Sequence, residues 1–357
     1  DVYKRQMGFE QYGGYAKLGY DISSFWKVWG DVNVTHFNAS NPGTIQVPLI
    51  DNDSRITRGM TSFALENHYE KTSGGLSFFY NWGRHKINDG YQIGKEPQKS
   101  HFNSKDKMLG VSWYQSATFF TGNRLTVGFD YQHFGGESWN KVLATGEHTP
   151  GVDKQMDEFA GYVDFRQDIS SWFSLDAGIR VDHHSHVGTE WIPQGGLAFH
   201  LPKNAELKAM VSKGYRNPTI REMYMFPPAN PELKPEKLIN YELSYSQRLL
   251  EGALSYGVSL YYINGDNLIM SNGLFPPLNI NSGEIENWGV ETNIGYHINS
   301  HWNVNANYSW LHMENPVLAA PEHKLYAGAD YTSGRWSIST GVQYVKAVSY
   351  THLRAHE

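Results

Sequence analysis

A group of charged residues in the second half of the chain could form ion pairs or bind a partner. Arg216, Glu222 and Glu236 lie close together, and Glu242 and Glu291 follow on later segments. A guanidinium group and several carboxylates can build a charge-assisted hydrogen-bond network. We expect these residues to shape the protein internally, and the alternative is that they pair with charges on another part of a larger protein.

Three histidines crowd one short connection, at His183, His184 and His186. Neutral imidazole is a ligand for transition metals and for haem iron, so a metal or haem site is one hypothesis. No carboxylate and histidine spacing in the chain matches a structural or catalytic metal site. We therefore expect surface histidines without a ligand and predict no metal.

The segment between Arg216 and Glu236 carries an apolar run and several prolines. The apolar run could contact an iron chelate or a porphyrin, although packing of the loop on itself is the commoner use of such side chains; it consists of Met223, Tyr224, Met225 and Phe226. The prolines fix φ and remove backbone donors, which predicts a stiff segment outside strand pairing; they are Pro227, Pro228, Pro231 and Pro235.

The sequence holds no enzyme signature. Gly-x-Ser-x-Gly, His-Glu-x-x-His and a phosphate-binding glycine loop are all missing, and the pair Asp157-Glu158 has no partner pattern. The chain has no Cys, which excludes a disulfide scaffold, a thiolate zinc site and a Cys nucleophile. We predict no catalytic residue and no cofactor, with a barrel-type enzyme kept as a minor alternative.

The charge balance argues against a nucleic-acid partner. The 357 residues include 30 Lys and Arg against 36 Asp and Glu, so the formal charge is −6, and no basic block occurs. Mean hydropathy is −0.53, and no stretch approaches the roughly 18 apolar residues of a transmembrane helix. Aromatic residues make up 14% of the chain, however, and lipid-facing strands escape such scales because they alternate with polar positions.

Apolar residues recur with a period of two along nearly the whole chain. Residues 158–169 and 174–182 are examples, with Phe159, Val163 and Ile179 on one register and Asp164 and Arg180 on the other. Such alternation indicates strands with one dry and one wet face. We count about 16 segments of about 9–11 residues, the length that a tilted strand needs to cross a bilayer.

The predicted connections alternate between two classes. Short ones fall at 22–25, 71–73, 121–123, 170–173, 202–204, 250–252, 299–301 and 333–335; mostly longer ones fall at 36–56, 86–106, 134–157, 183–188, 215–238, 264–285 and 312–322. This rhythm is typical of an outer-membrane barrel with short periplasmic turns and longer extracellular loops. Aromatic residues gather at the short turns and predict part of an interfacial girdle: Phe25, Trp26, Trp172, Phe173, Trp302 and Trp336.

The predicted fold class is therefore all-β, a transmembrane antiparallel up-and-down barrel without a second domain. A soluble propeller or sandwich array would also show alternation. The strand length, the strict alternation of connection classes and the charge on many polar registers favour the membrane barrel.

Residues 214–242, GYRNPTIREMYMFPPANPELKPEKLINYE, resemble the signature of TonB-dependent outer-membrane receptors. The matching positions are Tyr215, Arg216, Pro218, Thr219, Glu222, Asn230, Pro231, Leu233, Lys234, Pro235, Glu236 and Glu242. A second family run appears as Asn281, Gly283, Gly289, Val290 and Glu291, and Arg58-Gly59 resembles a family pair that opens a strand.

The resemblance implies a 22-stranded barrel with an N-terminal plug, in the outer membrane of a Gram-negative cell. Such receptors bind scarce nutrients outside and release them inward when the TonB complex pulls on the plug. We find no TonB box and no plug segment, and about 16 of the 22 strands. We expect residues 7–347 to be a partial barrel, flanked by non-native sequence at 1–6 and 348–357 that resembles sequencing adapters.

The predicted function is uptake of a metal chelate, such as a siderophore, haem or cobalamin, through extracellular loops. The expected partners are outer-membrane lipid, the small nutrient, and the TonB complex through the missing plug. A passive porin is the first rival, because about 16 strands suit one. It does not account for the signature, and an adhesin or a barrel enzyme has no motif in its favour.

Overall fold

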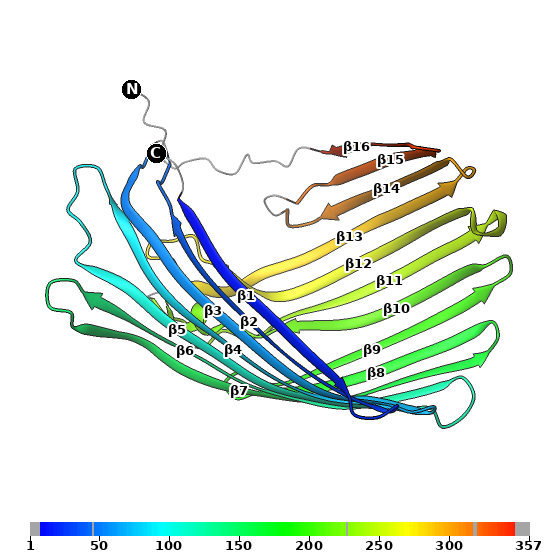
Figure 1. Ribbon diagram of the computed structural model, residues 1–357, viewed down its shortest axis with the longest axis horizontal. Coiled ribbons are helices and arrows are strands. Elements are labelled where there is room, and N and C mark those ends of the chain that lie inside the picture. The colour runs from blue at the N-terminus through cyan, green and yellow to red at the C-terminus, as the bar shows by residue number, and fades with distance from the viewer. Residues whose placement is uncertain (1–7, 45, 226–227, 317–319, 347–357) are drawn as a thin grey trace.

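The computed structural model is one antiparallel sheet of 16 strands, and it describes residues 8–44, 46–225, 228–316 and 320–346. Each strand pairs only with its neighbours in the sequence, in the order β1 to β16 (Figure 1). The predicted strand number, the up-and-down topology and the all-β class are therefore confirmed. The segments 1–6 and 348–357, expected to be non-native, lie outside the described residues.

The strands are β1 (Phe9–Asp21), β2 (Trp26–Ser40), β3 (Leu49–His68), β4 (Thr72–Gln92), β5 (Ser100–Ala117), β6 (Asn123–Val142), β7 (His148–Ser170), β8 (Phe173–His184), β9 (Gly188–Leu201), β10 (Ala205–Arg216), β11 (Glu236–Leu249), β12 (Leu254–Ser271), β13 (Asn279–His297), β14 (Trp302–Met313), β15 (His323–Ser333) and β16 (Trp336–Val345). The π-helical turn η1 (Arg221–Met225) follows β10, and the 3₁₀ turn η2 (Leu250–Gly252) follows β11. Within the described part of the chain, no helix has the length and apolarity needed to cross a membrane.

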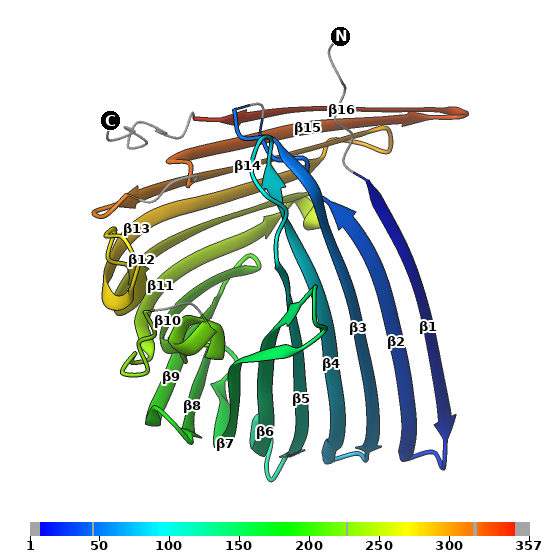
Figure 2. The ribbon, with the colours of Figure 1, turned by 90° about the vertical axis from the view of Figure 1, so that its left-hand side faces the viewer.

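The sheet curves into an open trough whose two edges are β1 and β16 (Figures 1 and 2). Its concave face holds η1, which is the coiled green ribbon in Figure 2. Strand alternation separates the two faces as predicted: Val163 of β7 lies opposite Ile179 of β8 on the convex face, and both are exposed. Charged pairs such as Arg180 with Asp130 lie on the concave face.

Four strands are roughly twice as long as the sequence pattern predicts, at 20 residues for β3 and β6, 21 for β4 and 23 for β7. The predicted long loops at 36–56, 86–106, 134–157 and 264–285 are wrong in large part, because hairpin pairing continues through them. The connections that remain are 41–48, 93–99, 143–147 and 272–278. A bilayer needs only about ten residues of a tilted strand, so these hairpins project beyond it on the long-connection side.

The pair Arg58-Gly59 lies inside β3 and does not open the strand, contrary to the sequence expectation. Gly59 is needed there because the ring of Trp82 covers it from β4. A Cβ atom at residue 59 would lie 2.2 Å from that ring. Residue 59 therefore fixes an aromatic side chain on the convex face.

The aromatic residues predicted for the girdle lie at the short turns, where Phe25, Trp172, Trp302 and Trp336 are exposed and Trp26 and Phe173 are half-buried. Trp172 is 59% exposed and Trp336 is 73% exposed. Phe25 stacks on Tyr69 of the neighbouring turn with ring centroids 4.8 Å apart, and Trp26 donates a 2.7 Å hydrogen bond to the Tyr69 hydroxyl. Such amphipathic contacts suit a membrane interface.

The open edges lead to the first prediction. Strands β1 and β16 each present a row of unpaired backbone groups, which hydrocarbon does not tolerate. The 357-residue chain refolded alone in detergent should therefore unfold in cold SDS and migrate at its heat-denatured position. A porin run on the same gel serves as the closed-barrel control, and a fast-migrating, heat-modifiable band from this chain would contradict the prediction.

Candidate functional site

The segment that joins β10 to β11, residues 216–236, folds back over the concave face of the sheet (Figure 2). We call it the signature segment. It carries η1 and most of the residues singled out from the sequence. Its described residues between Arg216 and Glu236 lie outside strand pairing, as expected from its prolines, whereas their stiffening effect stays a prediction and Pro227 lies outside the described residues.

Arg216 ties the two ends of the signature segment together. Its Nε and Nη2 donate to the carboxylate of Glu236 at 2.6 and 2.7 Å, and its Nη1 and Nη2 donate to that of Glu222 at 2.9 and 3.0 Å. The planar guanidinium thus makes two bidentate contacts, a geometry that lysine cannot provide. Glu236 also accepts a 2.8 Å bond from the backbone N–H of Ile269, which fixes the network to β12.

A capping box begins η1 within this network. The backbone N–H and the hydroxyl of Thr219 donate to Glu222 at 2.8 and 2.9 Å, and the Glu222 N–H donates back to the Thr219 hydroxyl at 3.1 Å. Pro218, almost fully buried, precedes the box. Burial opposes ionisation of Glu222, but the Arg216 and Thr219 donors outweigh it and lower the pKa of the Glu222 carboxyl.

The apolar run after Glu222 serves mainly for packing. Met223 is fully buried and forms a small core with Leu233 and with Met156 of β7. The hydroxyl of Tyr224 lies 3.4 Å from His186 Nε2, while Met225 lines the cavity described below. Phe226 lies outside the described residues.

Two asparagines of the second motif region hold the signature segment against β13. Asn281 accepts from the Lys234 N–H at 2.8 Å and donates to the Lys234 carbonyl at 2.9 Å, as a neighbouring strand would. Asn230 donates to the Asn279 carbonyl at 2.8 Å, and Asn279 donates to the Glu222 carbonyl at 3.0 Å. The two sequence motifs therefore contact each other directly.

The glycines of the second motif accommodate close neighbours. A Cβ at Gly283 would lie 2.6 Å from the sulfur of Met270, and one at Gly289 would lie 2.4 Å from the hydroxyl of Tyr261. Val290, the residue after Gly289, is half-buried and lies opposite Leu260 of β12.

Glu242 and Glu291 stand apart from the Arg216 network. Strand register places both on the concave face, with Glu242 opposite Tyr261 and Glu291 opposite Ser259. Within the described residues, neither carboxylate takes part in an ion pair. The structure thus unites Arg216, Glu222 and Glu236 and leaves the other two acids available to another element.

The three histidines have separate hydrogen-bond partners. His183 Nδ1 lies 2.8 Å from the hydroxyl of Thr189, and His186 Nε2 donates to the Pro231 carbonyl at 2.8 Å. His184 is 1% exposed, so the expectation of a surface histidine is wrong there: its Nδ1 accepts backbone N–H bonds that close the turn. The described chain contains no group of three or more His, Cys, Asp or Glu side chains suited to hold a metal ion.

Glu158 has partners that the sequence pattern did not reveal. The Tyr215 hydroxyl and the Asn217 side-chain amide donate to its two oxygens, each at 3.3 Å. Glu158 therefore links β7 to the start of the signature segment. Beside it on the concave face, Arg180 pairs with Asp130 and with the buried Asp182.

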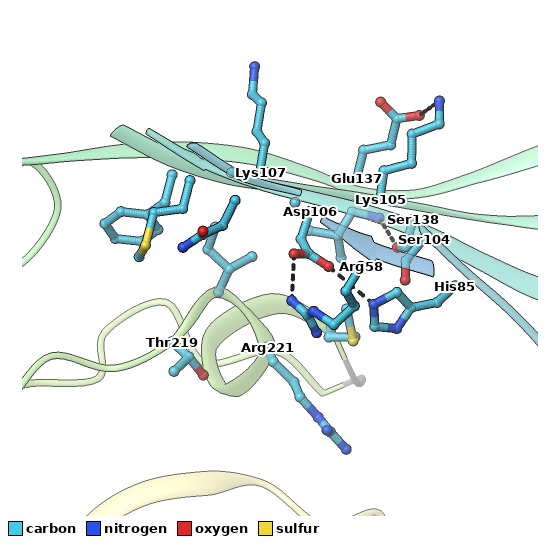
Figure 3. Close-up of a pocket in the computed structure, with 18 of the residues that line it drawn as sticks. Arg58, His85, Ser104, Lys105, Asp106, Lys107, Glu137, Ser138, Thr219 and Arg221 are labelled. Atoms are coloured by element: carbon cyan, nitrogen blue, oxygen red, sulfur yellow. Dashed lines mark hydrogen bonds and ion pairs between the residues drawn. The ribbon is translucent and has the colours of Figure 1, made fainter. Parts of the chain in front are cut away.

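A cavity of about 970 Å³ lies between strands β3 to β7 and the signature segment (Figure 3). At its centre Arg58 donates to Asp106 at 2.9 Å, and His85 Nε2 lies 3.2 Å from the other oxygen of Asp106. Asp89, Glu158 and Arg221 add further charges to the lining. Lys105, Lys107 and Glu137 also border the cavity, with side chains that point away from Arg58 and Asp106 (Figure 3). The rest of the lining is apolar or polar and neutral, and it includes Phe102, Phe134, Ile220, Met225, Gln132, Ser104 and Asn217.

This lining can bind an amphipathic molecule, because charged and polar groups lie among apolar and aromatic ones. Its size falls in the usual range for ligand sites. The sequence pattern did not identify His85, Asp106, Phe102 or Phe134, since all four fall in or at the edge of the segments expected to be loops. The only available signal was the strand alternation that continues through those segments.

Comparison with known proteins assigns a family to this arrangement. The family model described as "TonB dependent receptor-like, beta-barrel" matches residues 2–353. The "Vitamin B12 transporter BtuB" of Photobacterium profundum is 23% identical over an alignment of 229 residues, and the match covers 60% of this chain and 37% of that protein. The "Iron-regulated outer membrane virulence protein" of Vibrio cholerae is 25% identical over an alignment of 211 residues, and the match covers 49% of this chain and 31% of that protein.

A solved structure has the same fold. A mutant of the ferric enterobactin receptor PfeA from Pseudomonas aeruginosa superposes with a TM-score of 0.79 at 14% identity, over 95% of this chain and 57% of that one. The chain thus spans well under two thirds of the length of each of these proteins.

Arg216→Ala should release the signature segment. Two bidentate contacts on a half-exposed guanidinium contribute about 1–2 kcal/mol after allowance for solvent screening. Backbone amides of residues 217–235 should therefore exchange with deuterium about tenfold faster or more. The exposed neighbour Glu232→Gln is the matched control and should leave exchange unchanged; equal protection in the Arg216 variant would show that the network does not hold the segment.

The same segment should loosen in acid. The folded-state pKa of Glu222 lies below its ordinary value of 4.5, so its contribution is present above that value and is lost as the pH falls through the lowered pKa. Deuterium exchange in residues 217–225, corrected for the intrinsic rate, should rise below about pH 4. Glu222→Gln should be loose already at neutral pH with a weaker pH dependence, and a pH-independent wild type would contradict the assignment.

Proposed function

The chain belongs to the TonB-dependent receptor family, and from this premise we propose that it forms the nutrient-binding barrel of such a receptor. Proteins of this family reside in the outer membrane of Gram-negative bacteria, and so does this chain. The nutrient would enter from the side of the longer connections, bind in the cavity beside the signature segment, and pass inward through the barrel.

The cavity lined by Arg58, His85 and Asp106 is the observation that carries the proposal. It faces the concave side, has ligand size, and combines one ion-paired cluster with the aromatic side chains of Phe102 and Phe134. A metal chelate presents the complementary chemistry, because polar metal-binding groups are carried on an organic skeleton. Siderophores, haem and cobalamin share this property, and relatives of this chain are described as iron-regulated or as a vitamin B12 transporter.

The mechanism is binding followed by gated passage, without covalent chemistry. The acids Glu242 and Glu291, which have no ion pair among the described residues, are suited to meet cations of a plug domain inside the barrel. The TonB complex would then move that plug and supply the energy for release. A passive porin fits less well, because the signature segment folds across the concave face and narrows any open passage.

Uptake measurements test this function. A receptor containing this chain should be produced in a host with an intact TonB complex and in a TonB-deficient host. Radiolabelled ferric catecholate, ferric hydroxamate, haem and cobalamin are then offered in turn. We expect accumulation of one class, only in the TonB-proficient host; accumulation of small solutes of every class in both hosts would establish the porin instead.

Variants at residue 58 test whether the ligand binds in the cavity. Arg58→Gln removes a charged hydrogen bond from the lining and should weaken binding of the transported chelate by about tenfold. Arg55→Gln is the matched control, because residue 55 lies on the same strand but on the opposite face, where it pairs with Asp53 at 3.0 Å. If R55Q and R58Q bind the chelate equally well, the ligand does not use this cavity.

A further inference from the structure

Four cations form a cluster on the convex face of the barrel. Arg84 and Lys86 come from β4, Lys105 and Lys107 come from β5, and all four side chains are exposed. Arg84 lies directly opposite Lys105 in the sheet. Figure 3 shows Lys105 and Lys107 pointing away from the cavity side, on which Arg58 and Asp106 lie. We call this group the basic cluster.

The basic cluster begins where the apolar band of the convex face ends. Along β4 the same face carries Leu76, Phe78, Tyr80 and Trp82 before Arg84. From the start of β4 to Trp82 there are about ten residues, which in a tilted strand rise about 25 Å, the height of the hydrocarbon layer. Beyond Arg84, β4 continues to Gln92 and to the connection 93–99, which lies on the side of the longer connections. The basic cluster therefore lies at the external surface of the membrane.

Most of the charge in the basic cluster is not neutralised by the protein. Lys105 pairs with Glu137 at 3.2 Å, but no ion pair within the described chain includes Arg84, Lys86 or Lys107. Like charges directly opposite each other across two strands destabilise a sheet. Glu137 offsets the charge of Lys105, whereas Arg84, Lys86 and Lys107 keep a positive charge that a bound anion would stabilise.

A groove of about 600 Å³ provides space for that anion beside the apolar band. Gly135 and Gly136, which have no side chains, line it together with Trp82, Arg84 and Lys107. Asp153 and Glu137 border the groove on the side of β6 and β7, so the positive region is confined to β4 and β5. An anion with an attached apolar body would fit both the cations and the adjoining aromatic surface.

We propose that the basic cluster binds the phosphate groups of lipid A, the phosphorylated glycolipid of the outer leaflet. Arginine and lysine recognise phosphate through charged hydrogen bonds, and Arg84 can do so bidentately. The acyl chains would lie along Phe78, Tyr80 and Trp82, within the hydrocarbon layer. A free phosphate ion lacks this second contact and should bind much more weakly. The inference depends on the location in the outer membrane and not on which nutrient is carried.

The test compares lipid A with and without its phosphates. A receptor containing this chain is purified in detergent and mixed with bisphosphorylated lipid A, with dephosphorylated lipid A, or with inorganic phosphate, and bound lipid is counted by native mass spectrometry. We expect the bisphosphorylated form to bind at least about tenfold more tightly than the dephosphorylated form. Inorganic phosphate at millimolar concentration should displace little of it.

Matched charge variants locate the binding. The triple variant R84Q/K86Q/K107Q should lose lipid A affinity by about tenfold or more. The control R124Q/K203Q/R335Q removes the same charge from the short-turn rim and should keep it. Equal lipid binding by wild type and the first variant, or equal binding of the two lipid forms by wild type, would overturn the proposal. The second comparison needs no variant, so a folding defect in R84Q/K86Q/K107Q would not leave the question open.

Discussion

The contact of the Arg216 guanidinium with two carboxylates is the interaction on which the functional face depends. One carboxylate, Glu222, begins η1, and the other, Glu236, begins β11 and is fixed to β12. Without this bridge the segment between them would be held on the sheet by the small apolar core around Met223 and by hydrogen bonds such as those of Asn281 with Lys234. The signature segment forms one wall of the cavity, so the shape of the cavity depends on this bridge.

The sheet adds a second constraint, because it divides the side chains between its two faces. Within the membrane-spanning part of the sheet, strand alternation places apolar side chains on the convex face and charged ones on the concave face, and this separation also divides the functions of the two faces. Ligand chemistry is confined to the concave face, where Arg58, His85 and Asp106 meet. Contacts with the surrounding lipid are confined to the convex face, where the aromatic band passes into the basic cluster. Residues 105, 106 and 107 point alternately to the two faces, so one strand serves both.

The sequence predicted the architecture well because its signals are local and repeated. The period of two, the short aromatic turns and the motif around Arg216 each depend on neighbouring residues, and the strand number, the topology and the family agree with them. The segments 86–106 and 134–157 were assigned wrongly to loops, because the projecting hairpins are polar on both faces and lack the lipid-facing register. Their length comes from cross-strand pairing, which neighbouring residues do not encode.

The site itself was only partly accessible from sequence. The motif located Arg216, Glu222 and Glu236, but their bridging geometry depends on the path of the whole segment between them. Contacts between distant strands, such as Glu158 with Tyr215 or Arg58 with Asp106, have no signature in the chain. The burial of His184 likewise results from packing against Phe134 of β6, with ring centroids 5.7 Å apart.

Thiol labelling offers the most direct test of the packed signature segment, because the chain contains no native Cys. Met223→Cys and Glu232→Cys each introduce one thiol, the first at a fully buried position and the second at an exposed one. In a receptor displayed on intact cells, a membrane-impermeant maleimide should label residue 232 readily and leave residue 223 unmodified. Equal labelling of the two positions would contradict the account, because the segment would then not be packed on the concave face.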